Sequence, residues 1–218
     1  MSNMFLRILS GLIIGPLFII SILWVQPLFI ILMLFIAIIM LFEWYEMTKL
    51  SPPYLLLGLV VIPIPIISLI LVSIKYNNRW LLLAYFITIW SVDTFAMIGG
   101  KRLKGPKLAP YLSPNKTWSG LITGVIGAGI IMSLVSTIPN FNTTIYYLSN
   151  KASLISASML IAIVAQCSDL FISYFKRKFG IKDSGSFIPG HGGALDRFDS
   201  IILTAPILFL AVYYIQFI

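Results

Sequence analysis

Charged residues are scarce in this sequence. Only 10% of the 218 residues are Asp, Glu, Lys or Arg, whereas 59% are hydrophobic and the mean hydropathy is +1.00. Soluble domains usually carry about 25% charged residues, so the composition excludes both a soluble domain and a disordered chain. The single cysteine, Cys167, excludes a disulfide scaffold. We therefore expect an all-α, polytopic integral membrane protein in which residues 1–218 form one membrane domain.

Acidic residues are particularly few. Seven Asp and Glu stand against 15 Lys and Arg, which leaves a net charge of +8. The bases lie in short segments between apolar runs, as the positive-inside rule and attraction to anionic lipid headgroups both favour. Because no basic face on a soluble module is present, we expect no nucleic-acid partner. The chain size and the lack of targeting additions favour a bacterial inner membrane.

The apolar segments predict about seven transmembrane helices. A helix needs about 20 residues to cross the bilayer, and the uncharged stretch between Arg7 and Glu43 is divided by Gln26-Pro27 into two such segments. Pro63 and Pro65 predict a local bend that a bundle tolerates. The expected helices span 5–25, 28–45, 54–74, 79–98, 118–138, 152–174 and 199–217.

Two polar segments, 99–117 and 175–197, contain ten of the bases. Two helices separate them, so both segments face the same side, and their bases predict that this side is the cytoplasm. The N-terminus is then cytoplasmic and the C-terminus lies outside. Residues 1–78 form N-terminal helices, and residues 79–218 form catalytic helices that carry both polar segments.

Two aspartates lie inside predicted helices. Asp93 and Asp169 each precede the cytoplasmic helix end by six residues, or roughly 9 Å. No Lys or Arg lies at a similar depth in an apolar run, so we expect a functional cavity, open to the cytoplasm, rather than a structural ion pair. Ser173 and Lys176 follow Asp169 at helical spacing and share its face.

The segment from Asp169 to Asp199 concentrates acids, bases and glycines. Carboxylates bind hard cations such as Mg²⁺, whereas bases and glycine N–H groups bind phosphate oxygens. This combination predicts metal-assisted phosphoryl or nucleotidyl transfer. His191, between glycines, is either a phosphate contact or a structural hydrogen-bonding residue.

The same residues carry a family resemblance. Residues 168–185 contain S-x-x-K-R-x4-K-D-x-G from Ser173 to Gly185, and P-G-H-G-G-x-x-D-R-x-D follows from Pro189 to Asp199. Residues 93–120 contain Asp93-Thr94-Phe95-Ala96, Gly100-Lys101-Arg102, Lys107-Leu108-Ala109-Pro110 and Ser113-Pro114-Asn115-Lys116-Thr117-Trp118. Both stretches closely resemble the CDP-diacylglycerol synthase (phosphatidate cytidylyltransferase) family.

The resemblance implies condensation of CTP with phosphatidate to CDP-diacylglycerol and pyrophosphate, in phospholipid biosynthesis. It implies Mg²⁺ as cofactor, with K⁺ or a second divalent ion as a further candidate, and a homodimer as a possible assembly. The expected metal ligands are Asp169, Asp196 and Ser173, with Asp93 and Asp183 as further candidates. The expected catalytic residues are Asp169, Lys176, Arg177, Lys182, Asp183, Asp196 and Arg197. The expected substrate-binding residues are Lys116, Ser173, Lys176, Arg177, Lys182, His191, Gly192 and Gly193.

Three alternatives are open at this stage. Another CDP-lipid or polyprenol cytidylyltransferase would use the same parts. An ion-coupled transporter would also contain intramembrane acids, but the two halves of the chain show no internal repeat. A non-catalytic membrane subunit would leave the clustered acids unexplained.

Overall fold

The computed structural model describes residues 15–76, 79–141, 150–185 and 192–215. In these residues, five helices are long and apolar enough to cross a membrane, and a shorter apolar helix spans Ile201–Tyr214. This is the architecture of an integral membrane protein. Residues 15–23 are also helical, but the expected first helix begins outside the described residues. The count of seven crossings therefore stays a prediction.

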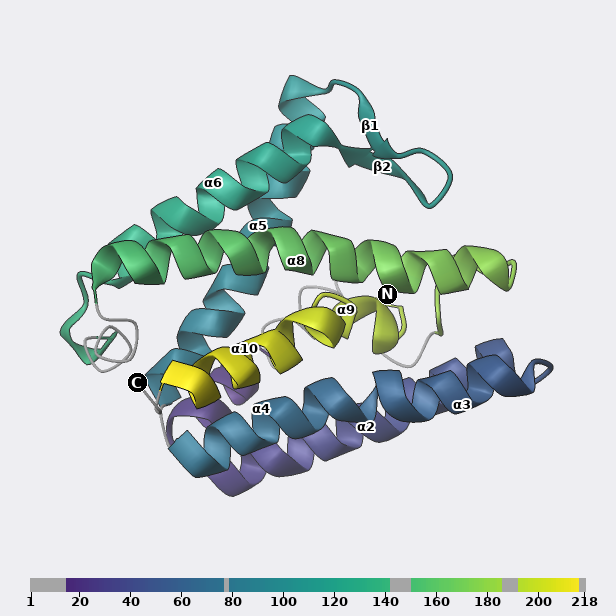
Figure 1. The fold of residues 1–218 in the computed structure, drawn as a ribbon, viewed down its shortest axis with the longest axis horizontal. Coiled ribbons are helices and arrows are strands. Elements are labelled where there is room, and N and C mark those ends of the chain that lie inside the picture. The colour runs from purple at the N-terminus through teal and green to yellow at the C-terminus, as the bar shows by residue number, and fades with distance from the viewer. Residues whose placement is uncertain (1–14, 77–78, 142–149, 186–191, 216–218) are drawn as a thin grey trace, which may run out of the picture.

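The N-terminal layer consists of α2 (Gln26–Thr48), α3 (Pro52–Val61) and α4 (Pro63–Tyr76). Helices α3 and α4 follow one another in line beside α2 (Figure 1). They are separated at Ile62, because the next residue, Pro63, has no N–H to continue the helical hydrogen bonds. The expected proline bend is thus confirmed as a short break within one apolar span.

Helices α5 (Arg79–Leu103) and α6 (Trp118–Val135) form a close pair. Glycines on α6 permit the approach: a Cβ at Gly120 would lie 2.9 Å from the Ala96 carbonyl oxygen, and one at Gly127 would lie 2.3 Å from a ring carbon of Phe95. Small residues are a common means of helix association in membranes, because they let the backbones approach and pack.

A β-hairpin connects α5 to α6 and was not expected in an all-α fold. Its strands are β1 (Lys107–Ala109) and β2 (Ser113–Thr117), paired antiparallel with Lys107 opposite Thr117. The Thr117 hydroxyl accepts a 3.0 Å hydrogen bond from the Gly120 N–H and caps α6. This cap fixes the end of the strand that carries Lys116.

The C-terminal part contains α8 (Lys151–Lys178), the short α9 (Leu195–Phe198) and α10 (Ile201–Ile215). A 3₁₀ turn, η1 (Pro139–Phe141), follows α6. Helix α10 lies between α8 and α4 and packs on both (Figure 1). It therefore joins the N-terminal layer to the rest of the molecule.

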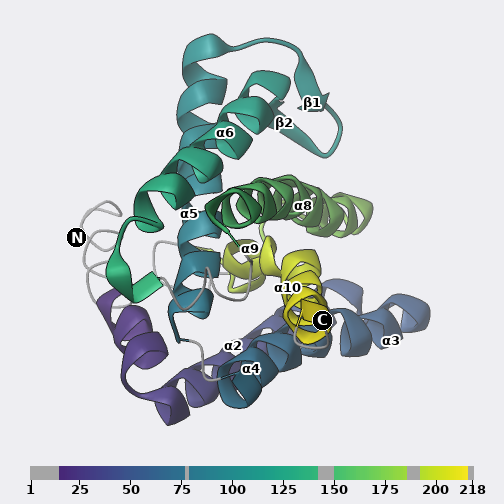
Figure 2. The same ribbon diagram turned by 60° about the vertical axis from the view of Figure 1, so that its left-hand side comes forward.

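The hairpin and the end of α8 lie on the same side of the molecule. Figure 2 shows α5 and α6 leaning away from the other helices, with the hairpin above the end of α8. The Arg177 Nε donates a 3.1 Å hydrogen bond to the Leu112 carbonyl in the hairpin turn. The two basic segments therefore lie on one side of the molecule, as predicted, and the structure adds that they are in contact.

Candidate active site

A polar cavity of about 790 Å³ opens between α5, α6, α8 and the hairpin. Asp93 from α5 and Asp169 from α8 both line it, so the prediction that these two acids share a cavity is confirmed. Four lysines also line it: Lys101, Lys104, Lys107 and Lys116. The volume is within the range of small-molecule sites, and the abundance of ammonium groups favours an anionic ligand.

Asp169 is paired with a lysine from the hairpin. The Lys116 Nζ lies 2.6 Å from Asp169 Oδ2, and the Ser173 hydroxyl donates to Oδ1 at 3.2 Å. The contact with Ser173 confirms the predicted shared face of α8. The expectation that Asp169 has no basic partner at its depth is wrong, because the hairpin brings Lys116 to it from outside the apolar runs.

The ammonium group of Lys116 is incompletely satisfied. Its Nζ is buried, and although it is close to Asp169, it makes no aligned hydrogen bond with any of the described residues. A buried ammonium has three N–H donors and is costly to leave without acceptors. Since Lys116 lines the cavity, an oxygen of an anionic ligand there would supply the missing acceptor.

A second polar group surrounds Asp196 at the start of α9. The Lys176 Nζ donates to Asp196 Oδ1 at 2.7 Å, and the N–H groups of Ser184 and Gly193 donate to Oδ2 at 2.8 and 3.3 Å. Lys176 and Asp196, both predicted catalytic residues, are therefore brought together. In this arrangement Asp196 holds two loop segments against the end of α8.

Asp199, which the sequence analysis did not assign to the site, interacts electrostatically with a member of each group, Asp169 and Lys176. It is 8% exposed, and burial raises the pKa of its carboxyl well above the usual range. Asp169 raises this pKa further, whereas Lys176 lowers it. Ser168 on α8 donates to the Asp199 carbonyl oxygen and accepts from the Leu203 N–H, which fixes the start of α10. The D-R-x-D spacing was the signal that could have identified Asp199.

The remaining predicted residues have varied positions. Arg177 is exposed and bonds the carbonyls of Leu112 and Ile181, so it holds the hairpin turn. Lys182 and Asp183 are exposed near the end of α8. Arg197 is exposed on α9 and interacts electrostatically with Asp93. His191 lies outside the described residues, and its flanking Gly192 has a positive φ of 83°.

The donor chemistry around Asp169 fits a hard cation. In the described part of the chain, no three His, Cys, Asp or Glu side chains form a complete ligand set. Mg²⁺ does not require one, because it is commonly held by one or two carboxylates together with waters and substrate phosphates. Asp169 offers a carboxylate beside the Ser173 hydroxyl, and Asp93 lines the same cavity, so two carboxylates are available there to a cation.

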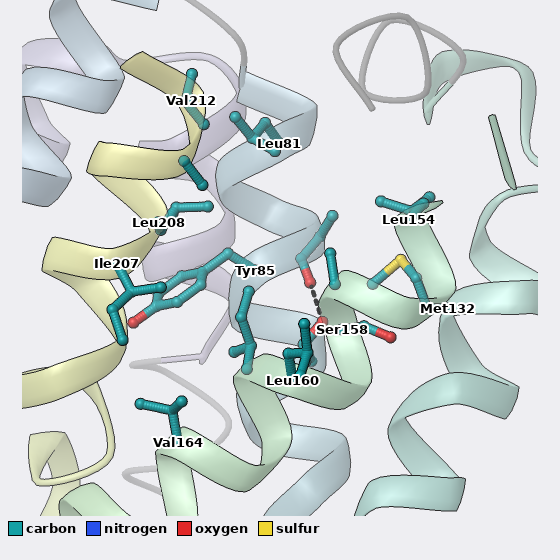
Figure 3. Close-up of a pocket in the computed structure, with 15 residues that line it drawn as sticks. Leu81, Tyr85, Met132, Leu154, Ser158, Leu160, Val164, Ile207, Leu208 and Val212 are labelled. Atoms are coloured by element: carbon teal, nitrogen blue, oxygen red, sulfur yellow. Dashed lines mark hydrogen bonds between the residues drawn. The ribbon is translucent and has the colours of Figure 1, made fainter. Parts of the chain in front are cut away.

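A second pocket is lined mainly by apolar side chains, unlike the cavity around Asp169. It measures about 180 Å³ and lies between α5, α6, α8 and α10, where Leu81, Leu154, Leu208 and Val212 point into it (Figure 3). None of the described residues that line it is charged, and the hydroxyl of Tyr85 is hydrogen-bonded to Thr204 at 2.6 Å. This pocket offers no group for nucleotidyl transfer.

Comparison with known proteins agrees with this geometry. Residues 51–215 match the model of the cytidylyltransferase family. The chain is 63% identical to the phosphatidate cytidylyltransferase of Rickettsia conorii, over 98% of this chain and 93% of that protein. It is 58% identical to that of Rickettsia prowazekii with the same coverage. A Brucella abortus phosphatidate cytidylyltransferase is 43% identical over 57% of this chain and 44% of its own length.

Proposed function

The chain belongs to the cytidylyltransferase family, and from this premise we propose that it is a membrane-embedded phosphatidate cytidylyltransferase. It would condense CTP with phosphatidate to give CDP-diacylglycerol and pyrophosphate. The observation that carries the proposal is the polar cavity, in which the Lys116 Nζ is buried beside Asp169 without sufficient acceptors. That cavity suits a highly anionic ligand at the edge of a membrane protein.

The reaction needs positioning and charge neutralisation more than proton transfer. An oxygen of the phosphatidate phosphate attacks the α-phosphorus of CTP, a new P–O bond forms, and the bond to the leaving pyrophosphate breaks. The attacking phosphate monoester is already largely ionised near neutral pH, so it requires no general base. Lys101, Lys104, Lys107 and Lys116 line the cavity and would neutralise the phosphates of the nucleotide.

We infer that Mg²⁺ is the cofactor and that Asp169 with Ser173 provides its protein oxygens. Mg²⁺ would neutralise charge on the triphosphate and orient it. Asp93 lies on the same cavity wall and is a further candidate ligand. Asp196 remains a predicted ligand, although in this structure its oxygens accept from Lys176 and two backbone N–H groups. The role of Asp183 and the identity of any second cation stay predictions.

The orientation is also proposed from the charges. Both basic segments lie on one side, and the positive-inside rule assigns that side to the cytoplasm, where CTP is available. The N-terminus would then be cytoplasmic and the C-terminus would lie outside, in a bacterial inner membrane. The proposed homodimer needs a separate measurement of mass in detergent.

The test is incorporation of labelled CTP into lipid by membranes that contain the full chain. We expect a lipid-soluble product with phosphatidate and Mg²⁺, and at least about a 100-fold loss without Mg²⁺ or in Asp196→Asn. Unchanged product in Asp196→Asn would contradict its predicted catalytic role. Polyprenol phosphate as an alternative acceptor tests the related cytidylyltransferase. If the folded protein converts neither lipid, the proposed function is wrong and the ion-coupled transporter becomes the leading alternative.

A further inference from the structure

Glu43 is a buried carboxylate on α2, far in sequence from the catalytic segments. It is 3% exposed. Its Oε1 accepts a 2.9 Å hydrogen bond from the Ala194 N–H, and its Oε2 accepts from the Leu195 N–H at 2.8 Å and the Ser184 hydroxyl at 2.9 Å. One side chain therefore holds two segments, 184–185 and 193–195, that are separated along the chain.

Two glycines, Gly185 and Gly193, lie so close to Glu43 that a side chain at either position would collide with it. A Cβ at Gly193 would lie 2.1 Å from the Ser184 Oγ and 2.7 Å from Glu43 Oε2, and a Cβ at Gly185 would lie 2.8 Å from Glu43 Oε1. Real Cβ atoms do not approach other atoms so closely. The requirement for glycine at both positions thus comes at least partly from the carboxylate, in addition to any contact with phosphate.

The same two segments hold Asp196. Ser184 donates its N–H to Asp196 and its hydroxyl to Glu43, and Gly193 donates its N–H to Asp196. Displacement of these segments would therefore displace the Asp196 carboxylate and its ion pair with Lys176. Two links therefore join Glu43 to Asp196: Ser184, which hydrogen-bonds to both carboxylates, and the backbone of Ala194 and Leu195, which immediately precedes Asp196.

The residue beside Glu43 anchors it to the catalytic helix. Trp44 is 1% exposed, its ring packs on Phe175 of α8 with centroids 5.1 Å apart, and its Nε1 donates to the Tyr54 carbonyl at 2.8 Å. The end of α2 is consequently held against α8 one residue from Lys176. A rigid support of this kind allows a side chain to position its neighbours.

We propose that Glu43, on α2, is a positioning residue of the active site. Glu43 lies outside residues 51–215, which match the family model. It acts on the reaction through Ser184 and Asp196 and does not contact the substrates. This inference rests on the proposed function, because its kinetic consequence is measured in the cytidylyltransferase reaction.

The experiment compares three full-length variants in detergent or membranes. Glu43→Gln places an amide N–H₂ against N–H donors and loses an acceptor. Ser184→Ala removes only the hydroxyl link and leaves its N–H bond to Asp196 in place. Glu46→Gln is the matched control, because Glu46 is on the same helix, three residues along, exposed and paired with Lys49 at 2.8 Å.

Two readouts are measured on each folded variant. For Glu43→Gln, we expect kcat per folded enzyme to fall about 10- to 100-fold while the KM for CTP changes less than about threefold. Ser184→Ala should show a smaller fall of the same kind, and Glu46→Gln should be unchanged. Hydrogen–deuterium exchange of the amides of Ala194 and Leu195 should accelerate in Glu43→Gln alone.

The outcomes separate this inference from the proposed function. If the parent chain has no cytidylyltransferase activity, the proposed function fails, while accelerated exchange still shows that Glu43 holds the segment. Accelerated exchange with an unchanged kcat would make Glu43 a structural residue and overturn the inference. So would a kcat equal to that of Glu46→Gln. If Glu43→Gln does not fold, Ser184→Ala decides: Ser184 hydrogen-bonds to both carboxylates, so an unchanged kcat there would overturn the inference.

Discussion

Glu43 and Asp169 are both carboxylates on apolar helices, but their partners differ in kind. Glu43 accepts from two backbone N–H groups and one hydroxyl, and it is 3% exposed. Asp169 is paired with a lysine ammonium group and with one serine hydroxyl, at the wall of a cavity of about 790 Å³. One carboxylate is enclosed and the other adjoins space for a ligand.

This difference indicates how the two acids contribute. Backbone donors cannot leave without unfolding a segment, so a carboxylate bound to them fixes structure. A lysine ammonium can exchange one anionic partner for another, so the carboxylate beside it can receive a cation when an anionic substrate takes the lysine. Charge inside a membrane helix thus has two distinct uses in one molecule.

The largest expected effect follows from Asp169→Asn. The substitution removes the negative charge at the cavity wall, so turnover should fall at least about 100-fold, because a proposed Mg²⁺ ligand is lost. The thermal midpoint should fall modestly: the Asn side-chain oxygen keeps an acceptor near Ser173 and Lys116, but the buried Lys116 ammonium loses its charged partner. Activity in membranes and thermal unfolding in detergent measure the two. A large loss of stability with retained turnover would show that Asp169, like Glu43, fixes structure and does not serve the reaction.

Lys116→Met should have the next largest effect. It removes the buried ammonium and retains an unbranched side chain, so the KM for CTP should rise about 10- to 100-fold, as expected for a lost charged hydrogen bond of about 1.5–3 kcal/mol. Lys151→Met, an exposed lysine at the other end of α8, is the control and should behave as the parent. Equal KM values for the two variants would remove Lys116 from the nucleotide site.

Gly193→Ala tests how tightly Glu43 is enclosed by its neighbours. The new methyl group would press on Ser184 and Glu43, and relief of this crowding should cost about 1–3 kcal/mol of unfolding free energy. Gly180→Ala is the control: it has a positive φ of 72° but no atom within 4 Å of an added Cβ, so only backbone strain applies. Denaturation of both variants measures the difference, and a smaller loss for Gly193→Ala than for Gly180→Ala would contradict the close contact with Glu43.

Hydropathy predicted the helices well but not their ends. Helices α5 and α8 continue to Leu103 and Lys178, beyond the expected ends at residues 98 and 174. Their last turns are charged, and charge marks the edge of an apolar run without ending a helix. Polar last turns that leave the hydrocarbon can keep their helical hydrogen bonds in water.

The hairpin and the contact of Lys116 with Asp169 were not predicted, for a different reason. Residues 104–117 are rich in lysine and proline, a composition typical of loops, and a strand of three residues leaves little periodic signal. Lys116 could be assigned to the site only through a motif. Its contact with Asp169, 53 positions away, depends on how β2 returns to α8.

Glu43 was overlooked because it stands two residues before the expected end of the helix 28–45. A charge in that position is usually a boundary marker, whereas Asp93 and Asp169, six residues from their ends, were evident. Asp199 was visible in the motif but had no assigned task. Distance from a helix end therefore identifies deep charges and misses shallow ones that tertiary packing covers.

The sequence by itself determined the membrane setting, the helix order and the family chemistry, because hydropathy, the positions of the bases and local motifs are properties of the chain read in order. Tertiary structure decided which charges meet. Ion pairs and carboxylate contacts act over a few ångströms, yet Lys176 and Asp196 are 20 residues apart in the chain and Glu43 and Leu195 are 152 apart. The packing of α2 against α8 buries Glu43 between two loop segments. The packing of the hairpin against α8 brings Lys116 to Asp169 at the wall of the cavity.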